Sequence, residues 1–350
     1  MAYTTIDDPT AYFQVKLYTG NNSTNAQTLD SDTDMQPDMI WFKRRDSAAF
    51  PSLIDAVRGV TKRLAPSETD AEGTVSDMLT SFDSDGFTLG DDDDNYINFN
   101  TATYVAWCWK ANGSGSSNTD GNVTTTVSAN TTAGFSIVKW TSTSDTPQSL
   151  GHGLGVAPKL IICKDLSATS GWVTGAKVLG WDKYLTLDSN SATTTDDRMF
   201  SPSGGSDPTS TLFYQTHAAI GSAGEGMIAF CLAEKKGYSK FSSFVGNGSN
   251  DGVFCWCGFK PAMIIYKKSG GTENWFIHDN KRQGYNPENE LLFPDLSNAE
   301  ATVNRIDLLS NGFKARTSDG GINADGSTYI YMAFAEAPFV NSNGVPATAV

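Results

Sequence analysis

Pro37-Asp-Met-Ile-Trp-Phe-Lys43 decides the fold of this chain, because its pattern returns as Pro158-Lys-Leu-Ile-Ile-Cys-Lys164 and as Pro261-Ala-Met-Ile-Ile-Tyr-Lys267. Each copy holds a proline, any residue, four apolar or aromatic residues and a lysine. A short apolar run of this kind, bounded by polar residues, is typical of a buried β-strand. The three copies indicate that the chain contains an internal repeat.

A second motif ends each copy, as Tyr104-Val-Ala-Trp-Cys108, Met227-Ile-Ala-Phe-Cys231 and Tyr331-Met-Ala-Phe-Ala335. The interval from the proline of the first motif to the alanine of the second is 69, 71 and 72 residues. Two independent motifs at such regular spacing indicate three related units of about 100 residues, the length of a β-sandwich domain. Solenoid repeats are shorter, at about 20–50 residues.

The predicted fold class is all-β, with three tandem related antiparallel β-sandwich domains of jelly-roll-like type. The apolar runs are rich in β-branched and aromatic residues, and Asp85-Gly86 and Asn311-Gly312 are hairpin dipeptides. Short helical turns are expected at Leu53–Val57 and Ser297–Val303. The predicted organisation is repeat 1 over residues 1–111, a Gly/Ser/Thr/Asn linker with a short strand over 112–134, repeat 2 over 135–235, repeat 3 over 236–340 and a C-terminal tail over 341–350.

Composition limits the classes of function. The 350 residues include 25 Lys and Arg against 39 Asp and Glu, a formal net charge of −14. This balance argues against nucleic-acid binding, which needs cations to displace condensed counterions, and against an anionic membrane surface. The opening Met1–Tyr18 lacks the regions of a secretory signal, and no apolar run approaches the roughly 20 residues of a membrane helix. We expect a soluble protein with no nucleic-acid partner and no membrane insertion.

The cysteines and histidines leave few chemical options. Three histidines in the whole chain restrict histidine-based catalysis and metal binding. The five cysteines lie among apolar neighbours, which predicts buried thiols made in a reducing compartment. Cys255-Trp-Cys257 is a weak metal signal, because no second cysteine pair or histidine stands at ligand spacing.

One stretch gives a weak signal for calcium. Asp83, Asp85 and Asp92 fall at positions 3, 5 and 12 of a calcium-binding loop, with Gly86 at position 6. Asp92 is shorter than the usual Glu, and Ser310-Asn-Gly-Phe313 repeats the turn without the acids. The sequence favours a solvated hairpin loop, and a surface Ca²⁺ site through these three aspartates is the alternative. No other cofactor is expected.

Two stretches resemble parts of catalytic sites but lack the other residues that such sites need. Gly151-His-Gly-Leu-Gly155 precedes a strand instead of opening a helix, so we expect a turn with an exposed His152. His278 and Asp279 form a pair that could assist a nucleophile, but repeat 2 has neither residue after Trp172. We therefore expect a solvent-facing His278 beside a structural Trp275. No carboxylate pair marks a glycosidase, and no catalytic residue is predicted.

Lysine recurs at the end of the first motif, as Lys43, Lys164 and Lys267. A lysine that follows a buried strand usually packs its stem against the core and keeps its ammonium group in water, and we expect that here. A repeated interface contact is the alternative.

Five phrases resemble a known protein family: Met1–Pro9, Asp34–Lys43, Ser81–Gly90, Tyr104–Lys110 and Tyr331–Phe339. They are similar to uncharacterised virion-associated proteins of tailed phages, especially marine ones, and the resemblance covers nearly the whole chain. It implies a phage structural gene product, tail- or fibre-associated. It carries no catalytic or ligand-binding residues over to this chain.

The expected function is that of a non-enzymatic structural protein on the surface of a tailed-phage virion, assembled in the bacterial cytoplasm. The leading hypothesis is a tail-fibre or appendage component that attaches to host-surface glycan. A capsid decoration protein on the outer head shell is the close alternative, and a polysaccharide depolymerase or a lectin module is the other. The expected partners are other virion structural proteins, a host-surface glycan and further copies of the chain. A trimer is a plausible oligomer because symmetry is common in virions, although no residue indicates it.

Overall fold

The computed structural model describes residues 3–92, 94, 96–143, 147–196, 199–201, 207–215 and 222–347. These residues form antiparallel sheets and one short 3₁₀ helix, η1 (Pro9–Ala11), so the all-β prediction is confirmed. The two expected helical turns are wrong. Leu53 lies in β4 (Ser52–Asp55) and Val303 in β25 (Ala301–Leu309), because both segments pair with neighbouring strands. No described helix is long and apolar enough to cross a membrane.

Each repeat contains a sheet in which the two sequence motifs lie side by side. In the first motif's strands, Ile40 faces Cys108, Ile161 faces Cys231 and Ile264 faces Ala333 across the ladder. The strand order is the same in all three sheets: β1 (Phe13–Thr19), β9 (Thr103–Trp109), β3 (Met39–Arg44) and β4 in repeat 1; β12 (Phe135–Thr141), β19 (Gly226–Leu232), β14 (Leu160–Asp165) and β15 (Val173–Ala176) in repeat 2; β20 (Ser239–Val245), β27 (Thr328–Pro338), β22 (Phe259–Lys268) and β23 (Phe276–Asp279) in repeat 3.

A smaller second sheet accompanies each of these. Side chains of alternate residues on the first motif's strand, such as Ile40 and Phe42, pack with residues of this second sheet, such as Phe87. The second sheets are β2 (Asn25–Thr28), β8 (Gly86–Leu89) and β7 (Leu79–Asp83); β13 (Gln148–Gly151) and β18 (Leu212–Gln215); β21 (Phe254–Trp256), β26 (Gly312–Ala315), β25 and β24 (Glu288–Leu291).

The polar segment 112–134 is part of a sheet. Its strands β10 (Ser116–Asn118) and β11 (Thr125–Asn130) extend the sheet of repeat 2 beyond β12, and β11 covers part of the short strand expected there. Strands β16 (Lys183–Thr186) and β17 (Thr194–Thr195) extend the other end of this sheet. A separate pair, β5 (Lys62–Arg63) and β6 (Gly73–Thr74), lies in repeat 1.

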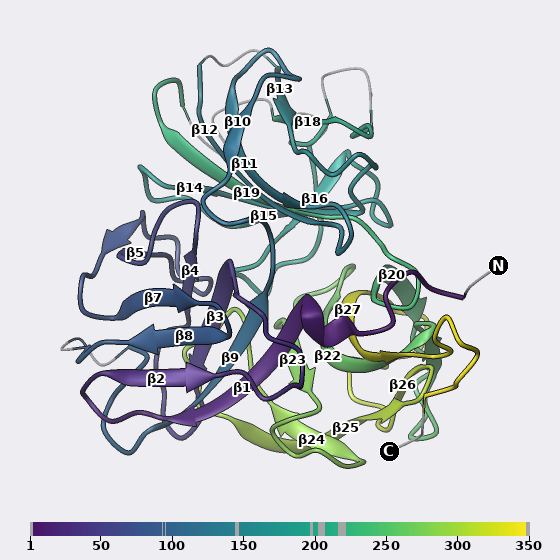
Figure 1. Ribbon diagram of the computed structural model, residues 1–350. Coiled ribbons are helices and arrows are strands. Elements are labelled where there is room, and N and C mark those ends of the chain that lie inside the picture. The colour runs from purple at the N-terminus through teal and green to yellow at the C-terminus, as the bar shows by residue number, and fades with distance from the viewer. Residues whose placement is uncertain are drawn as a thin grey trace.

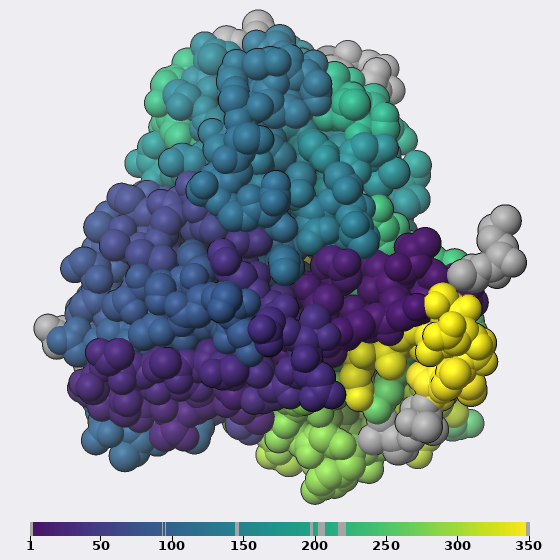
Figure 2. Space-filling model, viewed as in Figure 1, coloured from purple at the N-terminus to yellow at the C-terminus, as the bar shows by residue number. Residues whose placement is uncertain are grey.

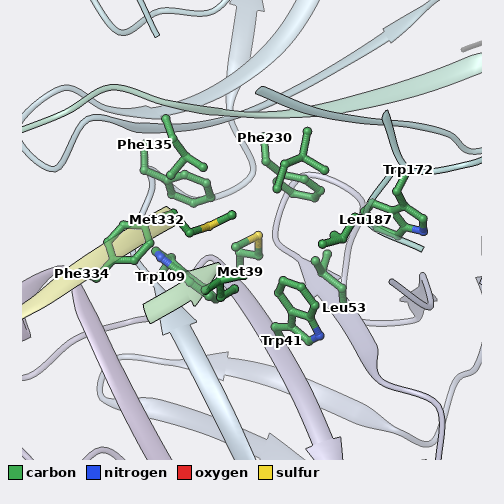
Figure 3. A pocket seen from close by; sticks show the side chains of 13 residues that line it. Met39, Trp41, Leu53, Trp109, Phe135, Trp172, Leu187, Phe230, Met332 and Phe334 are labelled. Carbon is green, nitrogen blue, oxygen red and sulfur yellow. The ribbon is translucent and has the colours of Figure 1, made fainter. Parts of the chain in front are cut away.

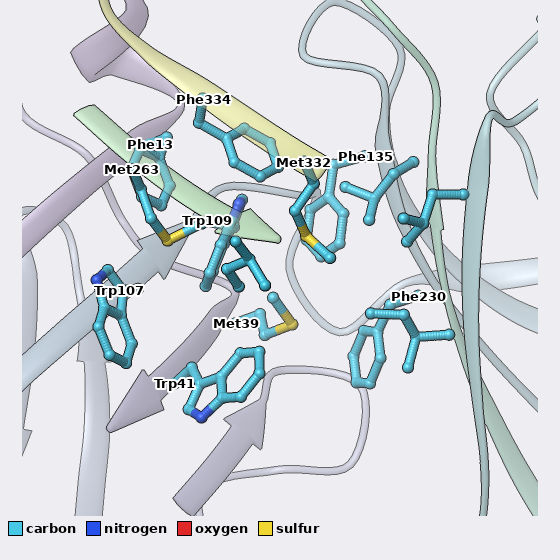
Figure 4. Packing of buried hydrophobic residues seen from close by; sticks show 14 of the residues in the cluster. Phe13, Met39, Trp41, Trp107, Trp109, Phe135, Phe230, Met263, Met332 and Phe334 are labelled. Carbon is cyan, nitrogen blue, oxygen red and sulfur yellow. The ribbon is translucent and has the colours of Figure 1, made fainter. Parts of the chain in front are cut away.

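The three repeats surround a common apolar centre. Figure 1 shows them as three lobes, with repeat 2 at the top, repeat 1 on the left and repeat 3 at the lower right. The second set of alternate side chains on the first-motif strands, including Met39, Trp41 and Ile265, meets there in one cluster with Phe135 and Phe334 (Figure 4). Both faces of these strands are therefore buried, which explains their four consecutive apolar residues.

A small cavity remains within this cluster. Its volume is about 30 Å³, and apolar and aromatic side chains of all three repeats line it, among them Trp41, Trp172 and Met332 (Figure 3). A cavity of this size holds about one water molecule, and apolar cavities usually stay dry. The centre of the molecule is therefore a packing core.

Candidate functional site at the contacts between repeats

Each repeat contacts the next through the same backbone hydrogen bonds. The amide six residues after each recurring lysine donates to a carbonyl of a neighbouring repeat: Ala49 to Ser297 (2.8 Å), Ser170 to Thr69 (2.8 Å) and Glu273 to Asn190 (3.0 Å). A second amide donates in the opposite direction: Glu300 to Arg45 (2.8 Å), Glu72 to Leu166 (3.0 Å) and Thr193 to Ser269 (2.8 Å). The contacts run from repeat 1 to 3, from 3 to 2 and from 2 to 1. The same head-to-tail interface thus occurs three times, and the three repeats close into a ring with approximate threefold symmetry.

The recurring lysines lie inside this ring, so the prediction of ammonium groups in water is wrong. Lys43 is 2% exposed, and Lys164 and Lys267 are fully buried. Lys43 Nζ donates to the carbonyls of Ala49 (2.6 Å) and Ser297 (2.8 Å), and the latter belongs to repeat 3. The strand is covered on both faces, which leaves no path to solvent at its end.

Lys164 makes the corresponding contact, from Nζ to the carbonyls of Ser170 (2.8 Å) and of Thr69 (3.1 Å) in repeat 1. Lys267 binds carbonyls of its own repeat, at Lys268 and Gly271. Burial lowers the pKa of Lys43 to about 7 and the pKa values of Lys164 and Lys267 to about 8. Two of the three lysines therefore form the repeated interface contact that was the alternative.

Tryptophan side chains at equivalent positions join two of the three interfaces. Trp172 Nε1 donates to the carbonyls of Ala65 and Glu68 in repeat 1, both at 3.1 Å, and Trp275 Nε1 donates to the carbonyl of Thr186 in repeat 2 at 2.9 Å. The strand register makes Trp172 and Trp275 equivalent, and the same position in repeat 1 is Pro51.

The interface between repeats 1 and 3 uses different groups. There Trp107 Nε1 donates to Asp279 Oδ2 (3.0 Å), and Arg45 pairs with Glu300 (2.7 Å). These contacts replace the one that Pro51 cannot make.

Buried ion pairs occur in repeats 1 and 3. Asp55 and Arg58 pair at 2.5 Å with both side chains inaccessible, and Arg58 also reaches Glu72 at 3.3 Å. Repeat 3 repeats this set as Asp279, Arg282 and Glu300, whereas repeat 2 has Ala176, Leu179 and Thr193 at the same positions. These pairs were not predicted, although the Asp-x-x-Arg spacing that repeats 1 and 3 share is a usable signal.

Both histidines expected at the surface are buried. His152 accepts a hydrogen bond from the amide of Leu154 at Nδ1, and its Nε2 lies 3.2 Å from the carbonyl of Thr209. His278 stacks on Tyr266, and burial and nearby arginines lower its pKa. Asp279 pairs with Arg282, so it is not the partner of a histidine base. These exposure predictions failed because β23 and the loop after β13 are covered by other parts of their repeat.

The aspartates of the calcium hypothesis serve local hydrogen bonds. Asp83 accepts from the hydroxyls of Ser81 and Thr88, and Asp85 accepts from the amide of Met35. Asp92 is buried and accepts from the amides of residues 97 and 98. Within the described ranges, no group of three His, Cys, Asp or Glu could hold a metal ion. The described residues therefore give no support to the calcium alternative.

All five cysteines, at positions 108, 163, 231, 255 and 257, are buried and unpaired, as predicted. Burial raises the pKa of every one of these thiols, that of Cys255 to about 12. A thiol in this setting behaves as a small apolar side chain.

Repeat 1 (purple) and repeat 3 (green to yellow) lie against each other in Figure 2. A polar groove lies at this contact. We call it the 1–3 groove. Two adjoining cavities of about 130 and 270 Å³ form it, and they share Asn280, Lys281 and Glu336. Repeat 1 contributes Thr10, Gln14, Asp30 and Ser31, and repeat 3 adds Lys260, Tyr285 and Glu288.

A loop that is longer in repeat 3 forms one wall of the groove. Nine residues separate Arg282 from Leu292, whereas five separate Arg58 from Leu64 in repeat 1. The two leucines are equivalent, because each exchanges backbone hydrogen bonds with the corresponding residue of the preceding strand. The four additional residues place Tyr285 and Glu288 in the wall. The groove is therefore a local departure from the threefold pattern.

Two polar oxygens in the wall have no hydrogen-bond partner among the described residues: Glu288 Oε1 and Asn280 Oδ1. Glu288 is 1% exposed, and burial together with the charge of Asp279 raises its pKa to about 8. Its carboxyl group is therefore largely protonated at neutral pH. Asn280 Nδ2 donates to Glu336 Oε2 at 2.8 Å, and Lys260 pairs with the same carboxylate at 3.0 Å.

Comparison with known proteins identifies the family. Neither the curated proteins nor the solved structures contain a match to this chain. The model of a protein family described as a domain of unknown function, DUF7483, matches residues 8–338. The match spans all three repeats and the ring that they form. The chain therefore belongs to the DUF7483 family.

Proposed function

We propose that the chain is a non-enzymatic structural protein on the surface of a tailed-phage virion, as a tail-fibre or appendage component. The closed ring of repeats carries this proposal. Three units place one face of their larger sheets on a common core, and their polar turns and smaller sheets point outward. Such a body offers a rigid, acidic outer surface on which partners and host contacts can be built.

We also propose that each repeat is a β-sandwich domain. Each larger sheet has its own apolar cluster toward its smaller sheet, separate from the shared centre. Two packed antiparallel sheets with an apolar layer between them are the defining feature of a sandwich. The sheet extension by β10 and β11 supports assigning residues 112–134 to repeat 2.

The ring of repeats also affects which oligomeric state the proposed function requires. One chain already supplies approximate threefold symmetry, so it can match the axis of a trimeric fibre or a threefold position on a capsid without forming a homotrimer. A homo-oligomer, other virion proteins and a host-surface glycan remain our predicted partners. Light scattering on the purified protein tests the oligomer: a monomer would contradict the homo-oligomer and leave the ring untouched.

Immunogold labelling of intact virions tests the location. Label on the tail or its appendages is the expected result, and label confined to the head would favour a capsid decoration protein instead. Purified particles that carry no label and no peptides of the chain by mass spectrometry would refute both.

A carbohydrate-directed role is the second candidate, and the 1–3 groove is the observation that favours it. Release of reducing sugar from host-surface polysaccharide by the purified protein would indicate a depolymerase and contradict a non-enzymatic role. Binding without release would indicate a lectin function.

A further inference from the structure

We propose that the 1–3 groove binds a neutral saccharide, with Glu288 and Asn280 as its hydrogen-bonding partners and Tyr285 as its stacking surface. The inference rests on the proposed surface role and names the ligand class and the site. The groove meets the first condition of a binding site, because it is a concave space with convergent polar groups at a contact between units.

The two unpartnered oxygens point to a ligand that donates hydrogen bonds. A buried polar atom without a partner destabilises the folded chain, so each such atom calls for an explanation. Glu288 and Asn280, the residues that carry these oxygens, both line the smaller cavity. Sugar hydroxyl groups can donate to both oxygens and can accept from Lys281, which lines the same space.

The charge pattern favours a neutral ligand. Glu336 and Lys281 line both cavities, Asp30 adds a carboxylate to the larger one and Lys260 adds an ammonium group to the smaller one. Each cavity therefore carries groups of both signs and favours neither an anion nor a cation. A largely protonated Glu288 adds a hydrogen-bonding group without adding a full charge.

Tyr285 supplies the apolar component. Tyr285 is 63% exposed at the wall of the groove, within the longer loop of repeat 3. An exposed aromatic ring beside polar groups offers one apolar face and one polar end, which suits the mixed surface of a sugar ring. The two cavities together lie at the lower end of the range of about 300–1,000 Å³ for drug-sized ligands, so the groove suits one or two sugar units.

The experiment is saturation-transfer-difference NMR on the full-length protein with methyl glycosides of glucose, galactose and N-acetylglucosamine, followed by titration of any glycoside that gives a signal. We expect at least one to bind. Tyr285→Ala should weaken that binding about tenfold, and Glu288→Leu should abolish the measurable signal. Glu288→Gln, which keeps hydrogen-bonding atoms of similar size, should retain most of the affinity.

Phe254→Ala is the matched control, because Phe254 is an exposed aromatic residue of the same repeat that does not line the groove. Equal losses in Phe254→Ala and Tyr285→Ala would overturn the proposal, as would no signal from any of the three glycosides. Circular dichroism and thermal melting establish that each variant is folded. A failed binding test together with positive virion labelling would remove the saccharide site and leave the proposed structural function intact.

Discussion

Trp172 of repeat 2 donates its indole N–H to the carbonyl of Ala65 in repeat 1, at 3.1 Å. Trp275 of repeat 3 makes the equivalent bond to Thr186 of repeat 2. The third equivalent bond is missing, because Pro51 occupies the tryptophan position of repeat 1. The ring therefore has two interfaces with this equivalent tryptophan bond and a third that depends on a different tryptophan, Trp107, and on the Arg45–Glu300 ion pair.

Removing only the indole donor should weaken the ring. Trp172→Phe leaves the carbonyls of Ala65 and Glu68 without this partner while keeping an aromatic ring in place. We expect a loss of about 1–3 kcal/mol in the free energy of unfolding, measured by urea denaturation. Trp256→Phe is the control: Trp256 is 48% exposed, so its change should stay within about 0.5 kcal/mol. Equal effects of the two substitutions would mean that the interface bond contributes nothing.

Repeat 2 has uncharged residues at the positions of the buried ion pair of repeat 1, and these residues can be copied to test that pair. Asp55→Ala leaves the inaccessible guanidinium of Arg58 without its main partner and should cost about 3–5 kcal/mol. The double variant Asp55→Ala with Arg58→Leu copies Ala176 and Leu179 and should recover more than half of that loss. Urea denaturation of the single and double variants measures the recovery. A double variant no more stable than Asp55→Ala would show that the charge pair is not the cause of the loss.

Lys43 should make stability depend on pH in a specific window. The pKa of Lys43 is about 7 in the folded chain against an ordinary value of 10.5, so between these pH values the unfolded chain binds more protons than the folded one. The contribution of Lys43 to stability therefore rises with pH from about 7 to 10.5 and is constant below 7. Lys43→Met lacks this dependence. Its stability relative to the unsubstituted chain should be highest at pH 7 and should fall toward pH 10.

Thermal or urea unfolding of both proteins at several pH values between 7 and 10 gives this difference directly. Comparing the two proteins cancels the opposing titration of the cysteine and tyrosine side chains, which is common to both. A difference that stays constant over the range, or that grows with pH, would contradict a buried Lys43 ammonium.

The five thiols should be unreactive in the folded protein. All are buried, and burial raises the pKa of each, so little thiolate is available to an alkylating reagent. We expect no modification by iodoacetamide under native conditions and modification at all five positions in denaturant, measured by mass spectrometry. Rapid native labelling at Cys255 or Cys257 would indicate that the β21 region opens.

Several features could be predicted from the residues alone. The two motifs placed the buried strands β3, β14 and β22 and the strands β9, β19 and β27 along the chain, because short apolar runs recur there at regular spacing. That the strands of the two motifs pair with each other was seen only in the structure. The burial of the cysteines followed from their apolar neighbours. The all-β class followed from short β-branched and aromatic runs without helical periodicity.

Other features depended on contacts between residues far apart in the chain. The buried state of Lys43 and His278, the ring and the 1–3 groove were not predictable from local pattern. Four consecutive apolar residues, as in Met39–Phe42, indicate that both faces of a strand are buried, but they do not identify what covers the second face. The sequence by itself thus determined the strands and the threefold repeat. Only the tertiary structure decided that the repeats cover one another, because packing between distant segments leaves no periodic signal within either one.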